Sequence, residues 1–73
     1  MDKTSLMTNQ FRIKRSDGTF SGDHVIEYQE RMTTNVGMVE GSKYYVRDSD
    51  QAPLKQISET EYVVETTGER IHV

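Results

Sequence analysis

The chain carries few side chains that could make or break covalent bonds. It has no cysteine, and its two histidines are His24 and His72. Nucleophilic catalysis needs a nucleophile beside a base that a third group orients. His24 follows Asp23 in a segment typical of a turn, where a solvated histidine is expected, and His72 is the penultimate residue. We therefore expect no catalytic residue, and the sequence predicts a protein that is not an enzyme.

One spacing partly matches a calcium-binding loop. Asp48, Asp50 and Glu59 stand at the first, third and last ligand positions of such a loop. However, Ala52 stands where another oxygen ligand belongs, and Pro53 replaces the glycine that makes the sharp turn. The sequence therefore predicts neither a metal site nor a bound cofactor.

The main functional pattern is the combination of basic and aromatic residues in segments 11–15 and 43–47. Tyrosine and arginine are favoured anchors at protein interfaces. In small barrels the same combination can stack nucleic-acid bases and hold phosphates. A third interpretation is that one of Tyr44 and Tyr45 belongs to the core and the other is exposed by simple alternation. The candidate partner-binding residues are Phe11, Arg12, Lys14, Arg15, Tyr44 and Arg47.

Charge is unevenly distributed along the chain, whose formal net charge is −3. Residues 1–22 contain four basic and two acidic side chains, whereas residues 48–73 contain two basic and six acidic ones. Two regions of opposite potential can orient a protein partner, although ordinary solubilising charge gives the same pattern. The overall acidity argues against DNA as the main partner, because phosphate binding needs a concentrated basic surface.

The elements that position these residues are mostly strands. Phe11 and Ile13 alternate with basic residues, and the following Asp17-Gly18 pair predicts a hairpin with a type I′ turn. Segment 23–34 fits either a helix or a strand. We favour the strand because Val, Ile, Tyr and Thr are abundant there.

The second half of the chain continues the same pattern. Strands are predicted at 43–47, 62–64 and 70–73, with turns or loops at 40–42, 48–51 and 67–68.

The sequence thus predicts a mostly β fold. Residues 1–9 are interpreted as a flexible N-terminal tail and residues 10–73 as a single small β domain. Four or five antiparallel strands would form a small sheet or barrel with loose termini, and a helix at 23–34 would make the class α+β. The expected core residues are Phe11, Ile13, Phe20, Ile26, Tyr28, Val39, Tyr45, Leu54, Ile57, Val64 and Ile71.

The sequence also gives an expectation for location. It contains no apolar run long enough to span a bilayer and no N-terminal stretch like a signal peptide, and it lacks cysteine. We expect a cytoplasmic protein without a membrane partner.

In its size, polar start before Phe11, β core and acidic end, the chain resembles the small RNA-polymerase-binding transcription regulator of a Xanthomonas phage. This resemblance implies a non-enzymatic protein that binds host RNA polymerase in the bacterial cytoplasm and inhibits or alters transcription. The polar tail before Phe11 and the basic segment from Arg12 to Arg15 would then contact an acidic surface of the polymerase.

Three hypotheses follow for the partner. The leading one is a protein-binding regulator that occupies a surface on a larger host protein. The alternative is a small barrel that binds single-stranded nucleic acid. The third is an accessory domain of an enzyme or structural assembly with a permanent partner. A homodimer that pairs through the exposed edge strand 43–47 is also compatible with the sequence.

Overall fold

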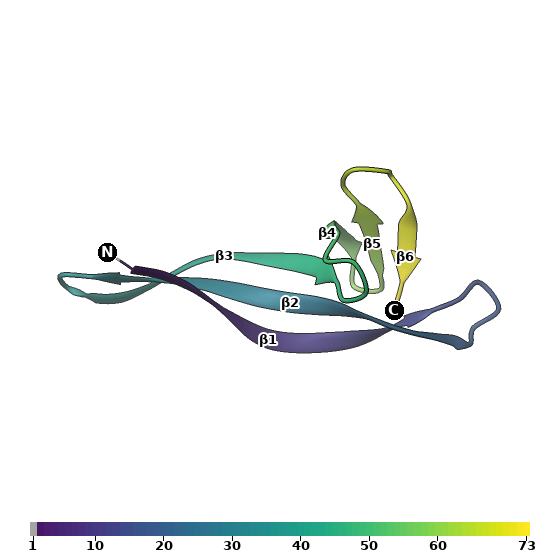
Figure 1. The fold of residues 1–73 in the computed structure, drawn as a ribbon, viewed down its shortest axis with the longest axis horizontal. Coiled ribbons are helices and arrows are strands. Elements are labelled where there is room, and N and C mark those ends of the chain that lie inside the picture. Colours follow the sequence, from purple (N-terminus) through teal and green to yellow (C-terminus); the bar gives the residue numbers. More distant parts are fainter. Residues whose placement is uncertain (1) are drawn as a thin grey trace.

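The computed structural model describes residues 2–73, which form six antiparallel strands and no helix (Figure 1). In chain order the strands are β1 (Asp2–Lys14), β2 (Phe20–Thr34), β3 (Gly37–Arg47), β4 (Pro53–Ser58), β5 (Glu61–Val64) and β6 (Arg70–His72). Each strand pairs with the next, and β6 returns to β1 to close a barrel. The predicted antiparallel β class is confirmed in its barrel form, with six strands instead of four or five. Segment 23–34 lies within β2, so the helical alternative is wrong.

The barrel occupies only one end of the molecule. Strands β1, β2 and β3 pair along most of their lengths, whereas β3 meets β4 only through Tyr45 and Val46. Barrel closure rests on one pair, Lys14 opposite His72. The remaining parts of β1, β2 and β3 extend beyond the barrel as a three-stranded sheet, residues 2–8 and 28–44, which we call the arm (Figure 1).

The arm makes the molecule long. Its principal extents are 50 × 22 × 20 Å, and its Cα radius of gyration is 14.2 Å. A compact chain of this length would have a radius of gyration of about 11 Å. The difference means that a large part of the chain lies outside any core.

The structure differs from the expectation of a loose tail at residues 1–9. Residues 2–9 form the first part of β1, with Lys3 opposite Met32 and Met7 opposite Tyr28. This edge strand is exposed on both faces, so it shows none of the hydrophobic alternation by which a half-buried strand is predicted. Pairing with β2 defines it instead. Residue 1 lies outside the described residues.

The predicted hairpin between β1 and β2 is present, but its turn is different. The Gly18 N–H donates a 2.9 Å hydrogen bond to the Arg15 carbonyl, and Gly18 is the residue of this turn with a positive φ, 87°. The Asp17 carboxylate accepts a 3.0 Å hydrogen bond from the Thr19 N–H. One positive φ, at a glycine that ends the turn, is typical of a type I turn with a glycine bulge instead of type I′.

The predicted turn at 40–42 is instead an irregular part of β3. The chain reverses at residues 35–36, where Thr34 pairs with Gly37. Residues 41 and 42 lie opposite the single residue Glu30, so the strand forms a β-bulge. A Cβ added to Gly41 would lie 3.3 Å from the Glu30 Cβ, so the glycine permits close packing rather than a reversal of the chain.

The hydrophobic core lies inside the barrel and is small. Five expected core residues are buried: Ile13, Ile26, Leu54, Val64 and Ile71. Val25 and Tyr62, which are almost fully buried, were not among the expected core residues. Phe20, Val39 and Ile57 are exposed, so their assignment to the core is wrong. Phe11 and Tyr45 are partly buried and pack against the core.

Candidate functional site

The structure separates the six predicted binding residues. The Phe11 ring is half-buried against the core, with its centroid 6.5 Å from that of Tyr62. Arg47 lies on the barrel rim, and Tyr44 lies at the base of the arm. The other three, Arg12, Lys14 and Arg15, stay together on the β1–β2 hairpin.

Arg47 is occupied by a structural ion-pair network. Its Nε and Nη2 atoms donate to the Asp50 carboxylate at 3.0 and 2.7 Å, and its Nη1 donates to Glu69 at 2.6 Å. The hydrogen bonds that Arg47 donates lower the pKa of Asp50 to about 2, and the same bonds to the Asp50 and Glu69 carboxylates raise the pKa of Arg47. Arg47 thus holds the loop after β3 to the turn before β6.

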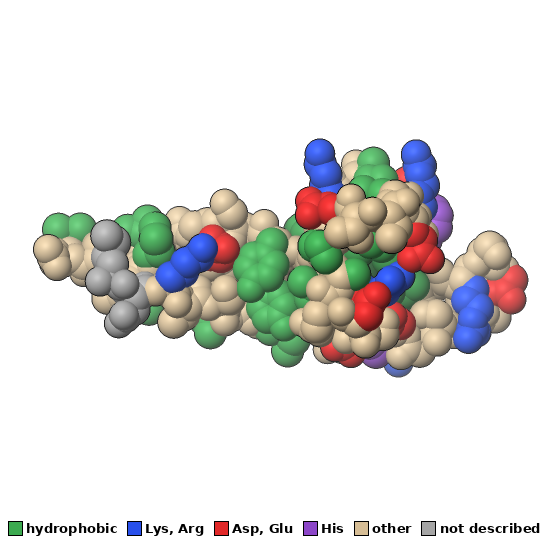
Figure 2. All heavy atoms as spheres, turned by 45° about the horizontal axis from the view of Figure 1, so that its top comes forward, with side chains coloured by type: hydrophobic (Ala, Val, Ile, Leu, Met, Phe, Trp, Pro, Cys, Tyr) green, Lys and Arg blue, Asp and Glu red, His purple; other side chains and the backbone are tan. Residues whose placement is uncertain are grey.

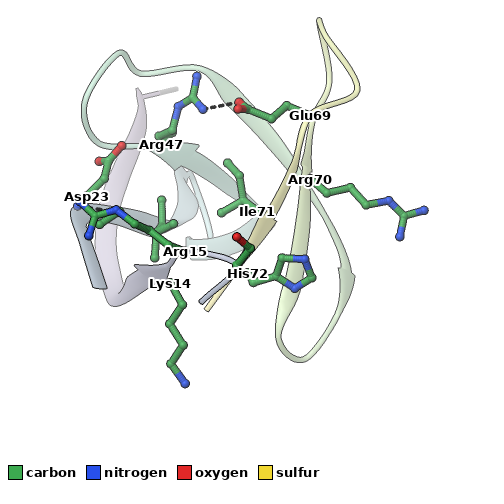
Figure 3. A pocket seen from close by; sticks show the side chains of 11 residues that line it. Lys14, Arg15, Asp23, Arg47, Glu69, Arg70, Ile71 and His72 are labelled. Carbon is green, nitrogen blue, oxygen red and sulfur yellow. Dashed lines mark hydrogen bonds and ion pairs between the residues drawn. The ribbon is translucent and has the colours of Figure 1, made fainter. Parts of the chain in front are cut away.

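A cavity of about 780 Å³ opens at the mouth of the barrel beside this network (Figure 3). Its cationic side chains do not converge on one point, because Lys14, Arg70 and His72 point outwards (Figure 3). Arg70 and His72 each lie 3.4 Å from a carboxylate oxygen of Glu61. Nothing in this arrangement places a nucleophile against a base.

Asp23, on the wall of this cavity, also has a structural role. Its carboxylate accepts hydrogen bonds from the His24 N–H at 2.8 Å and the Ser49 N–H at 3.1 Å. Burial raises the pKa of Asp23, but these hydrogen bonds outweigh burial, and the pKa falls below its ordinary value. Within residues 2–73, no group of three or more potential ligand side chains could hold a metal ion.

One candidate binding surface is the end of the β1–β2 hairpin. We call Arg12, Lys14, Arg15 and Phe20 the basic tip. The Arg12 guanidinium carbon lies 4.9 Å from the centroid of the Phe20 ring, and the Lys14 Nζ lies 6.0 Å from it. Phe20 is 49% exposed, and a hollow of about 240 Å³ lies between Arg12, Phe20 and His24. Figure 2 shows basic side chains at the hairpin end of the molecule, beside an acidic side chain.

The other candidate surface is the arm. Among the described residues, six of the eight exposed large hydrophobic side chains belong to it: Leu6, Met7, Met32, Val36, Met38 and Val39. Figure 2 shows several separate patches of hydrophobic side chains along the arm. A monomeric soluble protein rarely concentrates its exposed apolar residues in this way.

On one side of the arm, the strand register aligns three of these hydrophobic side chains with two tyrosines. Met7 lies opposite Tyr28, Tyr28 lies opposite Tyr44, and Met32 lies opposite Val39. Directly opposed residues share a face, and side chains alternate along β2, so Tyr28 and Met32 point to the same side. We call Met7, Tyr28, Met32, Val39 and Tyr44 the arm face.

The charged side chains described in the arm neutralise one another. Lys3 lies 3.2 Å from Glu30, Arg31 lies 4.0 Å from Glu40, and Lys43 lies 3.9 Å from Glu27 at the arm's base. The arm therefore combines exposed apolar area with balanced charge. Except for Tyr44, sequence reasoning missed this surface. The signal that could have found it, the pairing of Met7, Tyr28 and Tyr44, emerges only from the strand register.

The fold and these surfaces define the class of the protein as a small antiparallel β-barrel with a projecting three-stranded arm. Comparison of the chain with protein-family models, curated proteins and solved structures finds no match. None of the described residues forms a helix long and apolar enough to cross a membrane.

Proposed function

We propose that this protein is a non-enzymatic protein-binding module that docks through its arm on a larger partner protein. The observation that supports the proposal is the concentration of exposed apolar side chains on a sheet that lies outside the barrel core. Burying such side chains removes apolar area from water, which is the dominant favourable term in most protein–protein association.

The backbone of the arm supports the same proposal. Neither outer edge is paired with another described strand, since β1 meets β6 only at Lys14 and β3 meets β4 only from Tyr45 onwards. Open edges of this kind accept an additional strand from a binding partner. A nucleic acid cannot supply a strand, and the neutralised charges of the arm offer little to phosphate groups. The chemistry of the arm therefore favours a protein with an apolar, uncharged surface and an accessible strand.

The resemblance described above makes bacterial RNA polymerase the first purified partner to test. We propose that binding there would alter transcription in the host cytoplasm. The experiment is affinity capture with the tagged protein, from a bacterial lysate and with purified polymerase. It compares wild type with Val39→Lys in the arm and Ile57→Lys on β4, which are matched because Val39 and Ile57 are 45% and 49% exposed.

The proposal predicts a specific partner that is retained by Ile57→Lys and lost with Val39→Lys. Equal loss in both variants, or no specific partner for wild type, would contradict it. Sedimentation of the purified protein tests the homodimer. If wild type is a dimer and Val39→Lys is a monomer, the partner of the arm is a second copy of the chain and not a larger protein.

A further inference from the structure

The basic tip lies on the part of the β1–β2 hairpin that the arm does not include. Its cations form no ion pair within the described residues, and the acidic side chains nearby are Asp17 in the turn and Asp23 beside the hollow. Five of the nine lysine and arginine side chains form ion pairs within the described residues, namely Lys3, Arg31, Lys43, Arg47 and Arg70. Arg12, Lys14 and Arg15 form none there, and neither does Lys55. Three of the four remaining cations thus gather on one hairpin of an acidic protein. Arg12 and Lys14 lie beside the Phe20 ring, whereas Arg15 also donates a 3.0 Å hydrogen bond to the Phe20 carbonyl oxygen.

An aromatic ring accompanies these cations. Phe20 lies opposite Lys14 in the strand register and is half exposed, next to the hollow that Arg12, Gly22, Asp23 and His24 complete. Exposure of a phenylalanine ring to water is unfavourable, whereas stacking of a nucleic-acid base on the ring is favourable. Arg12 and Lys14 lie on one strand, on either side of a shift in the β1–β2 register, and both cations approach the same Phe20 ring.

We infer that the basic tip binds single-stranded nucleic acid, with phosphates at Arg12, Lys14 and Arg15 and one base on Phe20. An acidic peptide would match the cations but would leave the ring and the hollow unused. A duplex would hide the faces of its bases in its own stack. A single strand satisfies all three features.

The test is fluorescence anisotropy with a labelled oligothymidylate of roughly twelve nucleotides, a length within the range of small-barrel binding sites. Three phosphate contacts predict a slope of about −2 for the logarithm of the association constant against the logarithm of salt concentration. Arg12→Glu and Lys14→Glu should each weaken binding. Each should also reduce the magnitude of this slope by roughly one third, because one of the three phosphate contacts is lost. Lys55→Glu makes the same charge change outside the tip and should bind almost as wild type. Phe20→Leu keeps an apolar side chain without a ring and should weaken binding by roughly five-fold or more.

Three results would overturn the inference. The first is no binding at low salt, and the second is a loss with Lys55→Glu as large as that with Lys14→Glu. The third is unchanged binding by Phe20→Leu combined with efficient competition by polyglutamate, which would identify an acidic protein as the ligand of the tip. Circular dichroism of each variant separates these outcomes from failure to fold. The Val39→Lys variant should bind the oligonucleotide normally, so failure of the arm proposal is distinguishable from failure of this one.

Discussion

The side-chain amide of Gln29 donates a 2.8 Å hydrogen bond to the carbonyl oxygen of Gly41. The same nitrogen lies 3.1 Å from the carbonyl oxygen of Glu30, and Gln29 is the one polar residue among the buried side chains of the described chain. Gly41 belongs to the bulge in β3 and Glu30 lies opposite it on β2, where the regular ladder of hydrogen bonds is disrupted. The Gln29 side chain thus supplies hydrogen bonds where the backbone ladder is interrupted, and it joins β2 to β3 inside the arm.

We predict that Gln29→Leu destabilises the arm. Leucine has a similar size but leaves the Gly41 carbonyl without its donor, which should lower the free energy of unfolding by about 1–3 kcal/mol. Urea denaturation measures this loss, and amide hydrogen exchange should show that it is greatest in residues 28–44. Gln10→Leu is the control, because Gln10 is exposed and its side chain forms no hydrogen bond to the described residues. A similar loss in both variants would mean that Gln29 does not hold the bulge.

The sequence predicted the barrel region well, because hydrophobic alternation there reflects burial on one face. Ile13, Leu54, Val64 and Ile71 were all expected in the core and are buried. The arm could not be predicted in the same way. Its strands have no buried apolar face to impose alternation, so residues 1–9 were interpreted as a tail and residues 40–42 as a turn.

The candidate binding residues were also predicted only in part. Arg12, Lys14 and Arg15 were predicted as a group because they are close in sequence, and a strand and its turn keep them close in space. The binding role predicted for Arg47 has less support, because its guanidinium already bonds with Asp50 in the following loop and with Glu69 in the turn before β6. Exposure of Phe20 depends on which face of the hairpin meets the core, which the sequence pattern did not determine.

We predict that acid weakens the ion-pair network around Arg47. The folded state lowers the pKa of Asp50 from 3.8 to about 2, so Asp50 stabilises the fold above its unfolded pKa and loses this effect as the pH falls. The free energy of unfolding should therefore decrease between pH 4 and pH 2. Hydrogen bonds also lower the pKa of Asp17, and they lower that of Asp23 despite its burial, which adds to the same trend.

Urea denaturation at a series of pH values tests this prediction. Asp50→Asn removes the titrating group, so its stability should fall less steeply with pH than that of wild type. Asp48→Asn removes the same charge nearby, from a side chain that makes no hydrogen bond or ion pair to the described residues, and should keep the wild-type slope. An unchanged slope in Asp50→Asn would show that Asp50 does not contribute to the acid sensitivity.

We predict that the tyrosine pair at the base of the arm stabilises the junction between arm and barrel. The rings of Tyr28 and Tyr44 stack with centroids 5.1 Å apart and an interplanar angle of 16°, and the two residues lie directly opposite each other on β2 and β3. Neither hydroxyl forms a hydrogen bond to the described residues, so the rings carry the interaction. Tyr44→Phe should therefore retain wild-type stability. Tyr44→Ala should lose about 1–2 kcal/mol, because it removes both the stack and its apolar contact.

Thermal and urea denaturation measure these differences, and near-UV circular dichroism reports the environment of the rings. Because the pair belongs to the arm face, the proposed function adds a second expectation. Tyr44→Phe should keep the partner, whereas Tyr44→Ala should weaken its capture even under conditions in which the barrel remains folded. Full capture by a folded Tyr44→Ala variant would place the partner's contacts elsewhere on the arm. Equal instability of Tyr44→Phe and Tyr44→Ala would assign the stabilisation to the hydroxyl group and not to the stacked rings.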